Sequence, residues 1–317
     1  MKRREFIGGT VALAALTAVS GSVTADDEGP IVVFGYDSLA VDYALQLAAA
    51  NPQGALNRMQ SGIGCLTTDG FSMTQPGWCQ IWHGLPAYFT GILENADAIA
   101  TINRTHIVFR IFARRALDSL VWITGKGRNI SGFYDGQPGP HYEVYRLITE
   151  RRVPGAYFGD VERVNSEVTA LASLHLPTLG PRGIGFVHYH DPDETGHSSQ
   201  SFDDYMASAA SVDNDVAMLM DLCPAGTRFI LCSDHGFNFT ELGDIETNHM
   251  YAPHGFIAFS DPITTAPTSF ELRGSTVSAP MFNQPTVAAK VYRHFGFDPT
   301  DIRLVAGSYS LYHTRTI

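Results

Sequence analysis

Short hydrophobic runs of strand length alternate along the chain with segments of helical periodicity. The runs predict buried strands because they are short, rich in β-branched and aromatic residues, and bounded by turn-forming residues. They occupy residues 31–36, 184–190, 229–232 and 256–259. Strands that alternate with helices favour an α/β fold built on layers around one sheet.

Three segments predict helices, because their apolar residues recur at helical spacing or their ends carry helix signals. These segments are residues 41–50, 200–222 and 286–295. Ser201 stands three residues before Asp204, a pattern that predicts an N-terminal cap for the second helix. Pro285 and Gly296 flank the third helix in the order that helix ends favour.

The first 25 residues resemble an export signal. Lys2-Arg3-Arg4 precedes a mild apolar run from Gly8 to Val19, and small residues end at Ala25. Paired arginines with a short apolar run favour a twin-arginine signal peptide that is cleaved after Ala25 and directs the protein to the periplasm or the exterior. Retention as an anchor is the alternative, although a membrane-spanning helix needs a longer and more apolar stretch.

Residues 26–317 are expected to form a single domain. Their apolar content, 44% over the whole chain, is enough to bury one large core, and no repeat or linker divides them. The stretch from about 99 to 164 is rich in turn residues, as in Gly125-Lys126-Gly127. We expect it to form a cap over a site or to lie on the surface.

The charge of the chain limits its partners. The formal net charge is −11, and removing the first 25 residues takes away a net +2, which leaves −13. Such a chain does not attract nucleic-acid duplexes or anionic membranes, and no segment after the signal is apolar enough to span a bilayer. A small anionic substrate stays possible where metal ions set the local field. The sequence leaves the oligomeric state open.

Four cysteines would enter an oxidising compartment. They are Cys65, Cys79, Cys223 and Cys232. Two disulfides with three possible connectivities, or four buried thiols, fit the sequence equally well.

Three of the predicted strands run directly into aspartates, at Asp37, Asp193 and Asp234. One such aspartate alone favours a turn or a helix cap. Three at the carboxyl ends of strands in one sheet would meet in space and repel one another unless a cation compensates them. His197 and His235 accompany two of them, and carboxylates with imidazoles favour zinc or a similar divalent ion.

Five ordered motifs lie between Ile31 and Phe259. They are Gly35-Tyr36-Asp37-Ser38-Leu39 with Asp42, Thr74-Gln75-Pro76, Gly84-Leu85-Pro86 with Gly91 to Asn95, Pro192-Asp193 with Gly196-His197, and Ser233-Asp234-His235-Gly236. Together they resemble the alkaline-phosphatase superfamily, most closely its nucleotide pyrophosphatase/phosphodiesterase branch. The resemblance implies a three-layer α/β/α sandwich with a central, mostly parallel sheet.

The resemblance also implies a centre of two divalent ions, expected to be zinc, and a small phosphoester substrate. One ion would be held by Asp37, Asp234, His235 and Thr74, and the other by Asp193, His197 and His249, with His254 in reserve for the last position. Thr74 would be the nucleophile that forms a phosphothreonine, and Asn95 would donate a hydrogen bond to a phosphoryl oxygen.

Two departures from the family pattern bear on the substrate. His83-Gly84 stands where Thr-Gly is usual, and Thr90 replaces a histidine. A phosphodiesterase is the first interpretation. A phosphomonoesterase or phosphonate hydrolase would need an added cation, which Lys126, Arg128 or Arg104 could supply, and a non-catalytic binding protein is the third possibility. A sulfatase is disfavoured because the Thr74 segment offers no cysteine or serine.

Overall fold

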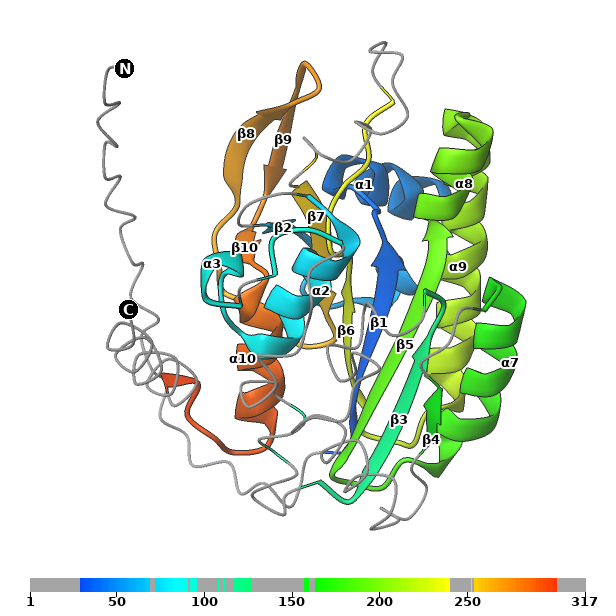
Figure 1. The fold of residues 1–317 in the computed structure, drawn as a ribbon, viewed down its shortest axis with the longest axis vertical. Coiled ribbons are helices and arrows are strands. Elements are labelled where there is room, and N and C mark those ends of the chain that lie inside the picture. Colours follow the sequence, from blue (N-terminus) through cyan, green and yellow to red (C-terminus); the bar gives the residue numbers. More distant parts are fainter. Residues whose placement is uncertain are drawn as a thin grey trace, which may run out of the picture.

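A central eight-stranded sheet organises the part of the chain that the structure describes (Figure 1). This computed structural model describes residues 29–68, 72–90, 92–95, 108, 111, 117–126, 157–159, 163–239, 252 and 254–300. The predicted signal peptide lies outside these residues.

The strands are ordered β10-β2-β7-β6-β1-β5-β3-β4 across the sheet. Their bounds are β1 Ile31–Asp37, β2 Ile63–Thr67, β3 Ser119–Thr124, β4 Tyr157–Gly159, β5 Gly183–Pro192, β6 Arg228–Cys232, β7 His254–Phe259 and β10 Met281–Asn283. Strand β7 pairs antiparallel with β2 and β6, and every other neighbouring pair is parallel. The prediction of a mostly parallel sheet is confirmed.

Helices cover both faces of this sheet. They are α1 Val41–Ala50, α2 Thr74–His83, α3 Ala87–Thr90, α7 Asn165–His175, α8 Asp193–Ser199, α9 Phe202–Leu222 and α10 Pro285–His294, with short 3₁₀ turns η1 Ala55–Arg58 and η4 Leu176–Thr178. A separate hairpin, β8 Thr268–Leu272 and β9 Ser275–Ala279, projects at the top of the view in Figure 1.

Alternating residues of β1 show why two helical layers form. Phe34 and Tyr36 pack into one core with α1, α7 and α9, whereas Ile31 and Val33 pack into a second core with α2 and α10. Successive side chains of a strand point to opposite faces, so a strand that is buried at every position must be covered on both faces. The three-layer α/β/α sandwich implied by the sequence is confirmed.

The predicted elements agree closely with the structure. Each of the four predicted strands and three predicted helices is present, and Ser201 Oγ accepts a hydrogen bond of 3.3 Å from the backbone N–H of Asp204. The segment 99–164 differs from the expectation in part, because its described residues include the sheet strands β3 and β4. The rest of that segment lies outside the described residues, apart from a few positions.

All four cysteines are free thiols. Burial raises the pKa of Cys79 to about 12, so its thiol is the form present at neutral pH. None of the helices within the described ranges has the length and apolarity needed to cross a membrane.

Asp213 is a buried carboxylate of α9 that joins three elements. It accepts hydrogen bonds from Tyr36 Oη at 3.2 Å, from the backbone N–H of Leu56 at 3.0 Å and from Asn51 Nδ2 at 2.9 Å. Its side chain is fully buried, and Tyr36 and Leu56 are also buried, so their donors depend on it for a partner. Asp213 therefore holds β1, η1 and the end of α1 against α9.

We predict that Asp213→Ala lowers the free energy of unfolding by about 3 kcal/mol, because it leaves buried donors without an acceptor. Asp221→Ala is the control, since it removes only the exposed pair with Arg58 at 2.7 Å and should cost less than about 1 kcal/mol. Urea denaturation measures both. Equal losses in the two variants would contradict the structural role of Asp213.

Candidate metal centre

Three neighbouring parallel strands end in the aspartates singled out from the sequence. β1 lies between β6 and β5, so Asp37 stands between Asp234, which follows β6, and Asp193, which opens α8 directly after β5. All three carboxylates are buried, with 0%, 0% and 3% of their surface exposed. The sheet order thus gathers at one edge residues that are far apart in the sequence.

The turn after β1 fixes the relation between two of these aspartates. Ser38 adopts a positive φ of 67°, a conformation that costs a non-glycine residue free energy. Its backbone N–H donates to Asp234 Oδ1 at 3.1 Å, and its carbonyl accepts from Tyr205 Oη at 2.8 Å. The strained turn is therefore held by contacts from the residue Asp234 that follows β6 and from Tyr205 of α9.

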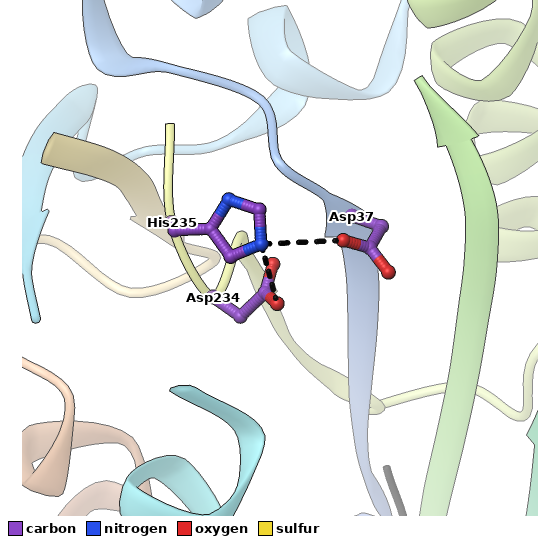
Figure 2. Close-up of side chains that lie close together, drawn as sticks. All are labelled: Asp37, Asp234 and His235. Atoms are coloured by element: carbon purple, nitrogen blue, oxygen red, sulfur yellow. Dashed lines mark ion pairs between the residues drawn. The ribbon is translucent and has the colours of Figure 1, made fainter. Parts of the chain in front are cut away.

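Asp37, Asp234 and His235 form a group suited to hold a metal ion (Figure 2). One potential ligand atom from each lies within 4.8 Å of the others. His235 Nε2 lies 3.7 Å from Asp37 Oδ1 and 3.4 Å from Asp234 Oδ2. His235 Nδ1 lies 2.9 Å from the Gly236 carbonyl, which only accepts, so Nδ1 carries a proton and Nε2 is the nitrogen that faces the site.

Thr74 lies beside this group as the first residue of α2. Its hydroxyl oxygen is 3.5 Å from His235 Nε2, and the residue is 7% exposed. Asn95 lies close by, because its Oδ1 accepts a hydrogen bond of 2.9 Å from the backbone N–H of Gln75. That bond leaves the amide NH₂ as the group that Asn95 can donate from.

Lys126 is the cation in the middle of the centre. Its Nζ lies 2.9 Å from Asp37 Oδ2, donates to Asp193 Oδ2 and lies 3.3 Å from the Thr74 hydroxyl oxygen. The ammonium group therefore bridges two of the three carboxylates and contacts the predicted nucleophile. The sequence marks Lys126 as a possible cation of the site, but its contacts with Asp37 and Asp193 become visible only in the fold.

The pKa shifts follow from this arrangement. Burial and the negative charge of Asp37 raise the pKa of Asp234 well above its usual range. Burial also raises the pKa of Asp37, but the Lys126 ammonium and His188 together outweigh it and lower the pKa overall. Burial likewise raises the pKa of Asp193, but Lys126, His197 and His235 together hold it well below its usual range. When all three carboxyl groups are ionised, they and the ammonium group carry a net charge of −2, which one divalent cation would balance.

The donor atoms fit such a cation. Asp37 Oδ1 and Asp234 Oδ2 are buried and accept no hydrogen bond from the described residues. Buried carboxylate oxygens without partners are costly unless a cation approaches them. Two carboxylates and an imidazole are a donor set that zinc accepts, so these residues fit the first predicted ion.

Only some of the residues predicted to hold the second ion lie within the described part of the chain. His197 lies on α8, with Nε2 3.5 Å from Asp193 Oδ1, and its hydrogen bond with Asp193 raises the pKa of His197. His249 lies outside the described residues. The reserve residue His254 begins β7, and its ring stacks on Phe270 with centroids 5.6 Å apart.

His188 is a further contact of Asp37. Its Nε2 lies 3.3 Å from Asp37 Oδ2, and its ring meets the ring of Trp78 edge to face at 5.0 Å. His188 is not among the site residues predicted from the sequence. The alternation along β5 was the available signal, because it puts residue 188 on the same face as Phe186.

The Metalloenzyme superfamily model matches residues 162–277 of this chain. The matched segment contains Asp193, His197, Asp234 and His235. No curated protein matches the chain.

Solved structures share the fold at low sequence identity. A variant of TAB5 alkaline phosphatase with magnesium bound superposes with a TM-score of 0.55 and 10% identity, over 86% of this chain and 99% of that one. A 2-O GAG sulfatase gives 0.50 and 12%, over 86% and 71%. Murine ectonucleotide pyrophosphatase/phosphodiesterase 5, as an inactive variant in complex with AMP, gives 0.48 and 18%, over 66% of this chain and 57% of its own.

The chain therefore shares the fold of alkaline phosphatase, and its residues 162–277 match the Metalloenzyme superfamily model. The superfamily resemblance read from the motifs is thus confirmed. The chain spans 57% of the murine phosphodiesterase, so the branch within the superfamily is a matter for proposal.

Proposed function

We propose that this protein is a metal-dependent phosphoester hydrolase of the phosphodiesterase or nucleotide pyrophosphatase type, with Thr74 as its nucleophile. The observation that carries the proposal is the position of the Thr74 hydroxyl. It lies 3.5 Å from His235 of the metal-binding group and 3.3 Å from Lys126 Nζ, at the start of a helix. A hydroxyl surrounded by cations and an imidazole loses its proton more readily than one in water.

Two divalent ions, proposed to be zinc, would be held by the two sets of ligands. Asp37, Asp234, His235 and Thr74 form the first set, and Asp193, His197 and His249 the second. When bound, the ions supply the positive charge that favours a deprotonated threonine oxygen and that balances charge on the phosphoryl group.

The residues of the chain account for the rest of the reaction. The Thr74 oxygen attacks phosphorus, the bond to the leaving oxygen breaks, and a phosphothreonine results. Water then attacks the same phosphorus, restores the threonine hydroxyl and releases the phosphate product. Asn95, held at its Oδ1 by the N–H of Gln75, donates its amide N–H to a non-bridging oxygen whose charge grows in the transition state.

The proposed substrate is a small phosphoester, because the acidic chain disfavours nucleic-acid duplexes. We propose further that the protein is exported by the twin-arginine route and acts in the periplasm or outside the cell. The signal at residues 1–25 supports this localisation. After its cleavage the proposed mature chain has no stable membrane span.

We predict that Thr74→Ala lowers the turnover of a nitrophenyl phosphodiester by about 1,000-fold or more, because it removes the attacking oxygen. Thr74→Ser is the matched control, since it keeps a hydroxyl on the same carbon, and it should retain part of the activity. Mass spectrometry of quenched unaltered protein should find phosphate on residue 74. Undiminished turnover in Thr74→Ala would refute the nucleophile.

A second candidate, a phosphomonoesterase or phosphonate hydrolase, is favoured by one observation. Lys126 Nζ lies 3.3 Å from the Thr74 hydroxyl oxygen, so it can reach an oxygen of a phosphoryl group attached or bound there. Monoesters and phosphonates carry one more charge than diesters, and an added cation beside the metal ions compensates that charge.

Substitution of Lys126 separates the two candidates. If dianionic substrates are the natural ones, Lys126→Met should lower kcat/KM for a nitrophenyl monoester by about 100-fold and for the diester by about tenfold or less. Lys126→Arg retains the positive charge and serves as the control. Equal losses on both substrates would mean that Lys126 acts on the carboxylates alone, which favours the phosphodiesterase.

A further inference from the structure

We propose that Arg273, at the tip of the β8–β9 hairpin, is a positioning residue for the metal centre. It would hold the segment Phe237–Phe239 against α8 and so fix the ring of His197. The effect on metal binding rests on the proposed function, because His197 is a ligand only in that proposal. The contacts of Arg273 do not depend on that function.

The guanidinium group of Arg273 joins two segments that are remote in sequence. Nη1 donates to Asp42 Oδ1 on α1 at 2.5 Å, Nε donates to Asn238 Oδ1 at 2.9 Å, and Nη2 donates to the carbonyl of Phe237. Its carbon Cζ also lies 4.3 Å from the centroid of the Tyr43 ring. Arginine can make these contacts together because its donors form a planar fork, which lysine lacks.

The burial of the Arg273–Asp42 pair makes these contacts consequential. The two side chains are only 14% and 15% exposed, so their charges are largely removed from water. Loss of one partner from a buried charge pair strongly destabilises the folded protein, because the other charge is left buried and unpaired. The pair also gives a structural role to Asp42, a residue of the first sequence motif, because Asp42 binds Arg273.

The hairpin turn shows that the position of Arg273 has a conformational cost. Arg273 and Gly274 are the two loop residues, with φ values of 50° and 74°. Turns with positive φ at both positions strongly favour asparagine or glycine at the first, and a left-handed conformation is unfavourable for most other residues. A residue that is unfavourable in its own turn but makes three side-chain hydrogen bonds indicates a role outside the turn.

Phe237 carries the effect to the metal centre. It lies two residues after His235, and its ring meets the His197 ring edge to face with centroids 5.2 Å apart. The same ring packs so closely on Gly196 that a Cβ there would lie 2.8 Å from it. Because Arg273 holds the Phe237 carbonyl, it restrains the residue that supports His197 and the helix on which His197 stands.

Arg273→Asn is the decisive variant, because asparagine suits the turn while it removes the guanidinium group. The double variant Arg273→Asn with Asp42→Asn avoids an unpaired carboxylate. In both, we expect zinc affinity to fall by about tenfold or more, as for other residues that support metal ligands. Arg273→Lys should show a similar loss of zinc affinity, because lysine lacks the planar fork of donors. Zinc affinity is measured by competition with a chromogenic chelator on protein whose melting temperature is recorded in parallel.

Arg58→Asn is the matched control. Arg58 also contacts one carboxylate, that of Asp221, and one backbone carbonyl, that of Ala217, near the C-terminal end of α9. This variant should leave zinc affinity and the imidazole NMR signals of His197 unchanged, whereas Arg273→Asn should move those signals. Zinc affinity within twofold of the unaltered protein in Arg273→Asn would overturn the inference. Zinc binding that depends on Arg273 in a protein without phosphoesterase activity would instead refute only the proposed function.

Discussion

Repulsion among three buried carboxylates is the constraint on which the rest of this structure depends. Asp37, Asp193 and Asp234 bring three negative charges to one edge of the sheet, where Lys126 supplies one positive charge. The pKa of Asp234 is raised because burial and the charge of Asp37 outweigh the opposing effect of Lys126. A divalent cation removes the same cost without a proton, and the arrangement is therefore one that favours metal binding.

The fold holds this repulsive group together with interactions formed elsewhere. Two apolar cores, one on each face of the sheet, fix β6, β1 and β5 side by side, so that their ends cannot separate. Locally, the Ser38 N–H satisfies one oxygen of Asp234, and the Gly236 carbonyl orients the ring of His235. The free energy of packing thus maintains a site that its own charges would open, as is common where function requires strain.

Sequence patterns predicted the sheet and its aspartates because both depend on local signals. A run such as residues 31–36 indicates a strand by itself, and an acidic residue at its end is visible without knowledge of the fold. Contacts of Lys126 and Arg273 could not be predicted, because they join segments separated by as many as 231 residues. Residues 119–124 also form an apolar run, which leads to Lys126 as the other runs lead to aspartates, so this strand could have been predicted in the same way. His249 stays a prediction, outside the described residues.

Anomalous diffraction from crystals grown with zinc tests the central claim most directly. The account predicts a peak at about 2.0–2.3 Å from a carboxylate oxygen of Asp37, a carboxylate oxygen of Asp234 and Nε2 of His235, with the Thr74 oxygen facing it. A peak at another place on the protein, with these three side chains paired only with one another or with Lys126, would contradict it.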